Sequence, residues 1–167
     1  MDVVELVKKA KRGNKEALLQ LIMAKRDELY RLAYSYMGNP HDAMDAMEEM
    51  IVKLYENINQ LKKEDAFYSW SKTILVNSCK AILRKKKKVV LVEDWNEHTE
   101  IENKAATSNP YQIQEQRLDI QQQLDELNPQ QAEAISLKYI HDLDYQTISE
   151  ITKVSIGTVK SRVFHGL

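Results

Sequence analysis

A run of cations follows an amphipathic segment near the middle of this sequence of 167 residues. Arg84 and the lysines at positions 85–88 continue residues 67–83, where aromatic, aliphatic and polar residues recur at helical spacing. Cations attract the phosphates of nucleic acid, and aromatic rings stack on unpaired bases. A solvated basic tail is the plainer interpretation of such a run. Because the run extends a helix that also carries aromatic residues, we favour single-stranded nucleic acid as its ligand.

Residues 67–88 are predicted to form one helix with an inward and an outward face. The inward residues would be Phe67, Trp70, Ile74, Leu75, Ser78, Ala81 and Ile82. The outward residues would be Ser71, Lys72, Thr73, Asn77 and Lys80. For Trp70, packing in the core is favoured over stacking on a base.

Four carboxylates form a second group with possible chemistry, which we call the acidic ridge. They are Asp42, Asp45, Glu48 and Glu49, and they lie beside His41. Paired carboxylates could hold a hard cation, so a metal-dependent enzyme is one alternative. A di-iron bundle would need a Glu-x-x-His pair from each of two helices, and the sequence contains none. It also lacks a Gly-rich phosphate loop and a nucleophile elbow. We therefore expect no catalytic residue, metal or cofactor, and interpret the ridge as a solvated face or a docking surface for a basic partner.

The most specific motif occupies residues 142–167 and has the spacing of a helix-turn-helix. Asp144 can cap a first short helix, residues 152–154 can turn the chain, and Ser155 can cap a second helix. The inward residues would be Ile148, Ile151, Val159 and Val163. The outward residues of the second helix would be Thr158, Lys160, Ser161, Arg162, Phe164 and His165. Such side chains can contact phosphates and base edges in a major groove.

Hydrophobic periodicity and chain breakers predict further helices around these groups. We expect helices at residues 3–12 and 15–37, and a third from about residue 40. Two more are expected near 114–127 and 129–141. Asn128 can cap the last of these, and Pro129 can occupy its first position. The second helix would bury Leu18, Leu19, Ile22, Leu29, Leu32, Ala33 and Tyr36. The third would bury Ala43, Met47, Met50, Ile51, Leu54, Ile58 and Leu61. The last two would bury Leu118, Leu124, Leu127, Ala132, Ile135 and Tyr139.

Composition and charge predict an all-α protein of two small helical domains joined by a flexible linker. Residues 1–88 hold 18 Lys and Arg against 12 Asp and Glu, a net charge of +6, whereas residues 89–113 carry −4 and residues 114–167 carry −3. We therefore expect domains at 1–88 and 114–167, with 89–113 as linker. The single cysteine, Cys79, excludes an intrachain disulfide and favours a reducing compartment. No apolar run reaches the roughly 20 residues that a membrane span needs, so we expect a cytoplasmic protein without membrane insertion.

The motifs together resemble the extracytoplasmic-function group of sigma-70 family RNA polymerase sigma factors. Residues 142–162, which include the sequence GTVKSR, are similar to region 4 of that family, whose helix-turn-helix reads the minus-35 promoter element. Residues 29–50 resemble region 2, and Trp70, Ile74 and Asn77 resemble the part that reads and melts the minus-10 element. In the turn, Lys153 stands where the family often has glycine.

The resemblance implies a non-enzymatic sigma factor in a bacterial cytoplasm, located at the nucleoid when bound to polymerase. Its partners would be core RNA polymerase, duplex promoter DNA, the opened non-template strand and an anti-sigma factor, with no homo-oligomer. Core polymerase would be bound by Asp45, Glu48 and Glu49. The minus-10 contacts would be Trp70, Asn77, Lys80, Arg84, Lys85 and Lys86. The minus-35 contacts would be Thr158, Lys160, Ser161, Arg162, Phe164 and His165.

One rival function, besides a metal-dependent enzyme using residues 42–49, is a stand-alone helix-turn-helix regulator with an N-terminal sensing bundle. Such a regulator would bind a duplex operator without polymerase, usually as a symmetric dimer. The sequence shows no dimerisation heptads.

Overall fold

The computed structural model describes residues 2–93 and 128–166, and every regular element in these ranges is a helix. This confirms the all-α prediction. The chain divides into two compact units, Met1–Leu83 and Arg84–Leu167. No helix in the described ranges combines the length and apolar composition needed to cross a bilayer.

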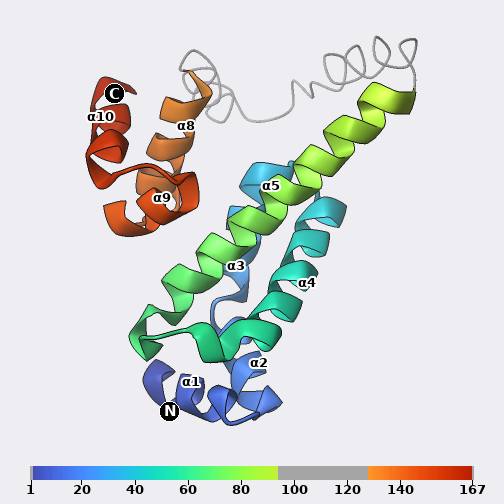
Figure 1. Cartoon of the computed structure of the whole chain (residues 1–167), viewed down its shortest axis with the longest axis vertical. Coiled ribbons are helices and arrows are strands. Elements are labelled where there is room, and N and C mark those ends of the chain that lie inside the picture. The colour runs from blue at the N-terminus through green and yellow to red at the C-terminus, as the bar shows by residue number, and fades with distance from the viewer. Residues whose placement is uncertain (1, 94–127, 167) are drawn as a thin grey trace. The chain divides into compact units, whose positions relative to one another are not determined.

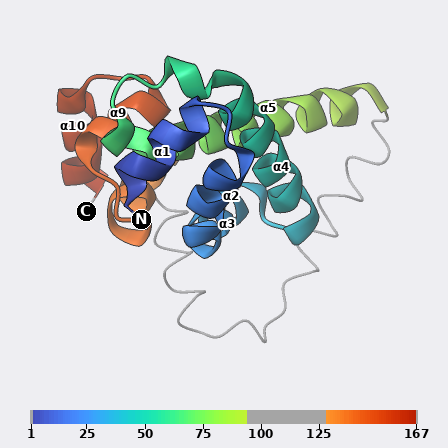
Figure 2. The same cartoon turned by 90° about the horizontal axis from the view of Figure 1, so that it is seen from below.

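The first unit contains four whole α-helices, two short 3-10 turns and the part of a fifth helix that precedes Arg84. The helices are α1 (Val3–Lys11), α2 (Lys15–Ala24), α3 (Arg26–Met37), α4 (Pro40–Asn57) and α5 (Phe67–Glu93), and the turns are η1 (Ile58–Gln60) and η2 (Glu64–Ala66). Figure 1 shows α3 and α4 running beside the long helix α5, and α3 packs on α4. Figure 2 views the same unit from the end where α1 and α2 lie, and these two helices pack on each other.

Side-chain caps fix where several of these helices begin. The carboxylate of Asp2 and the side-chain oxygen of Asn14 accept backbone N–H groups of Glu5 and Ala17 at 2.8 and 3.1 Å. Asn39 does the same for α4, where Pro40 occupies the first position. Each cap satisfies a donor that has no partner inside its helix.

The helix predicted over residues 15–37 is wrong, because the chain forms two helices that meet at Lys25. The backbone there leaves the helical region, with φ −121° and ψ 21°, and the Lys25 N–H bonds to the Ile22 carbonyl instead of continuing the ladder. Neither glycine nor proline marks this break. Leu19, predicted inward, is 55% exposed, and Tyr36 is half-buried, whereas the other five predicted positions are buried.

Helix α4 supplies the centre of the first core. Of the seven positions predicted inward, Ala43, Met47, Met50 and Leu54 are buried in α4, and Ile51 is half-buried. Ile58 in η1 and Leu61 directly after it are also buried, although they lie past the end of α4. The ammonium of Lys11 donates to the Leu61 carbonyl at 2.6 Å and lies 3.4 Å from a carboxylate oxygen of Glu64. These contacts attach α1 to the connection between α4 and α5.

The second unit contains α8 (Pro129–Ile135), a π-helical segment η3 (Ser136–Ile140), α9 (Tyr145–Thr152) and α10 (Ile156–Gly166). Asn128 caps α8 as predicted, accepting the Gln131 N–H at 2.8 Å. The core comprises Ala134, Leu137, Leu143, Ile148, Ile151, Val159 and Val163. The predicted helix over 114–127, with Leu118, Leu124 and Leu127, lies outside the described residues.

The inward face predicted for residues 129–141 is wrong. Tyr139 is 59% exposed, and Ala132 and Ile135 are only half-buried, while Ala134 and Leu137 face the core. The N–H of His141 bonds to the Ser136 carbonyl, an i to i−5 bond. A π turn holds more residues than an α turn, so a 3.6-residue period cannot be extended through it.

Candidate nucleic-acid and protein interfaces

Helix α5 is present, but its buried face is rotated from the predicted one. Its fully buried positions are Phe67, Ser71, Leu75, Val76, Ser78 and Cys79. The predicted inward residues Trp70, Ile74, Ala81 and Ile82 are only half-buried. The helix also runs to Glu93, past the end expected at residue 88.

Ser71 was predicted to lie outward and is instead fully buried. Its hydroxyl donates to the Phe67 carbonyl one turn earlier at 2.7 Å, so the polar group needs no water. Periodicity scores a serine as polar and cannot detect such a bond.

Lys72 was also predicted to be an outward cation, but its side chain is only 12% exposed. Its ammonium lies 3.0 Å from a carboxylate oxygen of Glu28 on α3. The hydrogen bond from Lys72 holds the pKa of Glu28 below its usual value, and burial opposes this only in part. Lys72 therefore joins α5 to α3.

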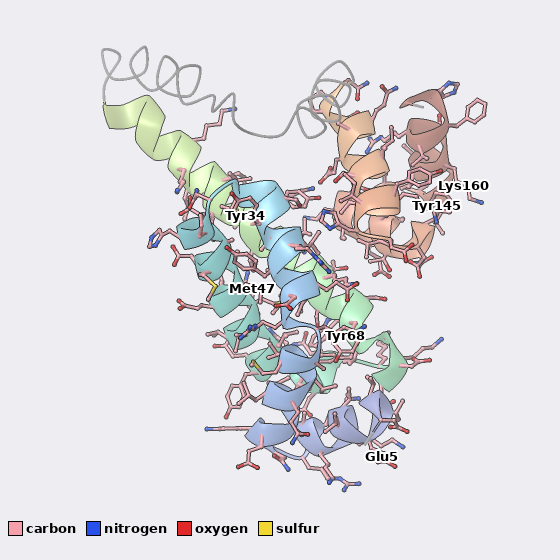
Figure 3. All side chains as sticks on the ribbon, turned by 180° about the vertical axis from the view of Figure 1, so that it is seen from behind. Glu5, Tyr34, Met47, Tyr68, Tyr145 and Lys160 are labelled. Atoms are coloured by element: carbon pink, nitrogen blue, oxygen red, sulfur yellow. The ribbon has the colours of Figure 1, made fainter. Side chains whose placement is uncertain are left out.

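Tyr68, one of the aromatic residues that the sequence places upstream of the cations, forms a second link from α5. Its hydroxyl donates to the Leu21 carbonyl on α2 at 2.7 Å, and the Lys25 ammonium lies 5.8 Å from the ring centroid. Burial, and then the nearby Glu28 carboxylate, raise the pKa of Tyr68. Figure 3 shows this side chain beside the start of α5.

The sites predicted for an opened DNA strand lie along α5. Asn77 and Lys80 are half-buried, and Arg84, Lys85 and Lys86 are exposed. The ring of Trp70 is half-buried, with its centroid 6.2 Å from that of Phe67. A partly exposed aromatic side chain and a series of cations thus share one helix, an arrangement that suits unpaired bases joined by phosphates.

Asp42 does not belong to the exposed acidic ridge, which corrects the prediction. It is 4% exposed, and its carboxylate accepts a bond from the Asn39 amide at 2.8 Å while the Asn39 oxygen accepts the Asp42 N–H at 2.8 Å. This reciprocal pair caps the start of α4, with Asn39 as the N-cap residue. The three remaining carboxylates, Asp45, Glu48 and Glu49, form what we call the trimmed ridge.

The trimmed ridge carries charge that solvent can reach. Asp45 pairs with His41 at 3.5 Å, and Glu49 pairs with Lys53 at 3.4 Å; both pairs are i, i+4 on the helix surface. Glu48 is exposed. Oxygen and nitrogen atoms of His41, Asp42 and Asp45 come within 4.8 Å of one another, but the Asp42 carboxylate is already used in the cap. The ridge therefore suits a basic protein surface better than a metal ion.

The helix-turn-helix forms as predicted. Asp144 caps α9 by accepting the Thr147 N–H at 2.7 Å, and Ser155 caps α10 by accepting the Thr158 N–H at 3.2 Å. Lys153 occupies the turn with φ +61°, in the left-handed region, and its N–H donates to the Ser149 carbonyl. The turn thus holds a conformation that glycine adopts without strain.

The predicted outward side chains of α10 are accessible to a ligand. Thr158, Lys160, Ser161, Phe164 and His165 are exposed, and Arg162 is half-buried. Phe164 is 75% exposed, and its ring meets that of His165 edge-on at 5.3 Å. A helix carrying hydroxyls, cations and one apolar ring can contact phosphates, base edges and thymine methyl groups.

One contact of this unit was missed in the sequence. The ring of Tyr145, the first residue of α9, lies near two lysines, with Lys138 Nζ 4.6 Å and Lys160 Nζ 5.6 Å from its centroid. Figure 3 labels Tyr145 and Lys160 close together in this unit. Lys138 lies in η3, outside the motif, so the helix-turn-helix spacing could not indicate it.

Comparisons with known proteins match both units. Residues 21–89 match the family model described as Sigma-70 region 2, and residues 117–167 match the one described as Sigma-70, region 4. RNA polymerase sigma factor SigV of Bacillus subtilis is 31% identical over 95% of this chain and 92% of its own length. ECF RNA polymerase sigma factor SigW of the same organism is 28% identical over 99% of this chain and 93% of its own length.

Two solved structures share the fold. Sigma factor RpoE of Bartonella quintana, in complex with the anti-sigma factor NepR, matches with a TM-score of 0.65 and 22% identity, over 88% of this chain and 89% of the other. CnrH, in complex with the cytosolic domain of CnrY, matches with a TM-score of 0.66 and 18% identity, over 98% and 91%.

Proposed function

Since the chain belongs to the sigma-70 family, and within it to the extracytoplasmic-function group of RNA polymerase sigma factors, we propose that it binds core RNA polymerase and directs promoter recognition, DNA melting and transcription initiation. The observation that carries the proposal is the presence of both sigma-70 regions in one chain, with a formed helix-turn-helix in the second unit. We assign region 2 to residues 1–88, a linker to 89–113 and region 4 to 114–167.

The trimmed ridge is the proposed binding surface for core polymerase. Asp45, Glu48 and Glu49 place carboxylates along one helix, and complementary charge on a partner speeds encounter and sets orientation. The pairs with His41 and Lys53 are exposed, so a cationic partner can replace them at small cost.

Promoter DNA is proposed to contact both units. Thr158, Lys160, Ser161, Arg162, Phe164 and His165 would read the minus-35 duplex. Trp70, Asn77, Lys80, Arg84, Lys85 and Lys86 would hold the opened strand at minus-10. Stacking on an aromatic side chain contributes about 1–3 kcal/mol per base, which offsets part of the cost of unstacking.

The chain would perform no covalent chemistry, because its role is to position polymerase on DNA. It would act in the bacterial cytoplasm, where polymerase and the nucleoid are. The solved structure of RpoE with NepR supports an anti-sigma factor as a further partner, which would cover the surfaces assigned here to polymerase and DNA.

Promoter-dependent RNA synthesis tests the proposal. Bacterial core polymerase and a library of genomic fragments are incubated with and without the full chain, and transcripts are sequenced. We expect specific transcripts only with the chain present. No such transcript, together with failure to comigrate with core polymerase in gel filtration, would exclude a sigma factor; binding of the chain alone to a duplex would then favour a stand-alone regulator.

A charge reversal in the trimmed ridge separates the polymerase surface from the DNA surfaces. Glu48→Arg with Glu49→Arg should weaken comigration with core polymerase at least tenfold, because two attractive contacts become repulsive. Glu16→Arg, an exposed carboxylate on α2, is the control. Equal behaviour of the two variants would remove the ridge from the interface.

A further inference from the structure

The junction of α2 and α3 carries more cations than its carboxylates can neutralise. A hollow of about 380 Å³ lies at this junction, where the backbone leaves the helical region at Lys25. Its lining includes three cations, Lys25, Arg26 and Arg31, and two carboxylates, Asp27 and Glu28. Which of these charges are free to meet a ligand depends on their existing partners.

Glu28 is already paired with a cation that does not line the hollow. The Lys72 ammonium on α5 lies 3.0 Å from the Glu28 carboxylate, whereas the Lys25 ammonium reaches it only at 3.7 Å. One carboxylate cannot neutralise two ammonium groups. The charge of Lys25 is therefore left for another anion.

The two arginines of the hollow are also free to bind an anion. Arg26 Nε lies 3.7 Å from a carboxylate oxygen of its neighbour Asp27, and their side chains are 61% and 87% exposed, so this pair contributes little. Arg31 is exposed and forms no ion pair or hydrogen bond with the residues that the structure describes. With Lys72 included, four cations stand against two carboxylates, a local excess of two positive charges.

We propose that Lys25, Arg26 and Arg31 form a binding site for a molecule with several phosphate groups. The guanidinium fork binds two phosphate oxygens at once, and the ammonium adds a point charge. The volume of the hollow lies in the range of about 300–1,000 Å³ that is usual for small-ligand sites. Two sources can supply this chemistry, a free nucleoside polyphosphate and the backbone of an opened DNA strand.

This site is separate from the cations already assigned to the opened strand. Lys72, which joins α5 to the junction, precedes Arg84 by 12 residues in the same helix. At a rise of 1.5 Å per residue, they lie about 18 Å apart along the helix axis. A phosphate bound at the junction therefore cannot also contact Arg84.

Titration of the full chain with inorganic tripolyphosphate tests the site without polymerase or DNA. Resonances of backbone amides and arginine Nε–H groups are followed by NMR. Those of residues 23–31 should shift and saturate, at a lower tripolyphosphate concentration than those of residues 84–87. Arg26→Gln with Arg31→Gln should raise the concentration at half-saturation about tenfold, because both guanidinium forks are lost.

The matched control is Arg12→Gln, which removes another exposed arginine of the first unit and should bind tripolyphosphate as wild type does. Arg31→Gln alone should weaken binding about threefold. Because the Arg31 side chain has no partner among the described residues, this variant decides the matter if the double variant does not fold. Shifts at residues 23–31 that do not saturate, or that are equal in wild type and in the arginine variants, would show an adventitious attraction and overturn the inference.

The source of the phosphates is identified with holoenzyme and a promoter fragment whose minus-10 base pairs are mismatched and already open. This part rests on the proposed function. If the opened strand occupies the site, Arg31→Gln should lower the slope of log K against log salt by about 0.7, the value for one phosphate of single-stranded DNA, and Arg12→Gln should not. An unchanged slope together with saturable tripolyphosphate binding would assign the site to a free nucleoside polyphosphate. A chain that directs no transcript would overturn the proposed function and leave the result of the tripolyphosphate titration standing.

Discussion

At the scale of single residues, local hydrogen bonds allow polar side chains to enter the core of the first unit. Ser71 bonds to the carbonyl one turn before it, and the Asp42 carboxylate is satisfied by Asn39. A buried polar group without such a partner would cost about 1–3 kcal/mol. Both residues were predicted to be exposed because residue type alone indicates polarity and carries no information about the partner.

In the turn of the helix-turn-helix, the backbone of Lys153 is strained, because a lysine occupies the left-handed region there. Its left-handed backbone costs a non-glycine residue roughly 1–2 kcal/mol. A glycine at this position would avoid that cost but would lose more conformational entropy on folding, so the net gain in stability is smaller. Lys153→Gly should therefore stabilise this unit by about 1 kcal/mol, measured by hydrogen exchange of amides in residues 145–163. Gln146→Gly, in the exposed part of α9, should destabilise it by about the same amount. Loss of protection in both variants would argue against strain at the turn.

Glu28 and Lys72 should make the stability of the first unit depend on pH. The pKa of Glu28 is lowered in the folded state from 4.5, first by the hydrogen bond from Lys72. The stabilisation that ionised Glu28 gives the folded state is complete above pH 4.5. It is lost as the pH falls through the lower pKa that Glu28 has in the folded state. In urea titrations, Lys72→Gln should reduce the free energy of unfolding at pH 7 and cause a smaller reduction below pH 4. A pH-independent difference, as expected for the control Lys62→Gln, would show that the ion pair contributes nothing.

At the scale of elements, the sequence predicts which helices exist better than where they bend or which side they bury. The helix-turn-helix, the caps at Asn128 and Asp144 and the stripe of α4 were all predicted, because each depends on residues close in sequence. The break at Lys25 was missed because no glycine or proline marks it. The face of α5 was misjudged because Tyr68 and Lys72 bond to α2 and α3, which are distant in sequence.

The same limit applies to the candidate interfaces. The outward residues of α10 could be predicted from one helical period, whereas the contact of Lys138 with Tyr145 joins a π segment to a separate helix, α9. Asp42 is buried, and so does not belong to the acidic surface, because it bonds to Asn39 in the cap of α4. Local patterns thus indicate a surface, and tertiary contacts decide which residues belong to it.

Helix α10 meets α8 at Gly166, and this close approach can be tested. A Cβ atom at Gly166 would lie 2.5 Å from Ile135 Cδ1 and 3.3 Å from Gln131 Cβ. Gly166→Val should therefore destabilise the second unit by about 1–3 kcal/mol through overpacking. The matched control is Gly157→Ala, where the added Cβ would meet only Ser155 Oγ at 3.9 Å and should be neutral or stabilising. Amide exchange in residues 129–140 reports the difference, and equal protection in both variants would contradict tight packing at Gly166.

At the scale of the whole molecule, opposite charges are separated along the chain. Residues 1–88 carry a net charge of +6, and residues 89–167 carry −7 by the same count of Lys, Arg, Asp and Glu. Within the basic part, the carboxylates of the trimmed ridge lie on α4, whereas Arg84, Lys85 and Lys86 lie on α5. Helices α4 and α5 can therefore present an acidic surface to one partner and a basic one to another.

This separation predicts a steep salt dependence for binding an opened strand. Arg84→Gln, Lys85→Gln and Lys86→Gln combined should lower the slope of log K against log salt by about 2, at about 0.7 per phosphate of single-stranded DNA. The measurement uses holoenzyme and a promoter fragment with mismatched, already open base pairs at minus-10. The control replaces the exposed lysines Lys8, Lys62 and Lys63 by Gln. A slope that falls equally in both variants would show a diffuse attraction with no defined contact.

The fully buried Cys79 thiol has a consequence for measuring the two units separately. It is the only cysteine in the chain, it lies in the first core, and burial raises its pKa to about 12. At pH 8 an alkylating reagent should therefore modify it only when that core opens. The labelling rate, followed by mass spectrometry, would report the opening of the first unit within the intact chain, even while the second unit unfolds and refolds. Labelling as fast as in urea-unfolded protein would contradict this. The labelling rate of this single thiol thus reports on the first unit alone and does not respond to unfolding of the second.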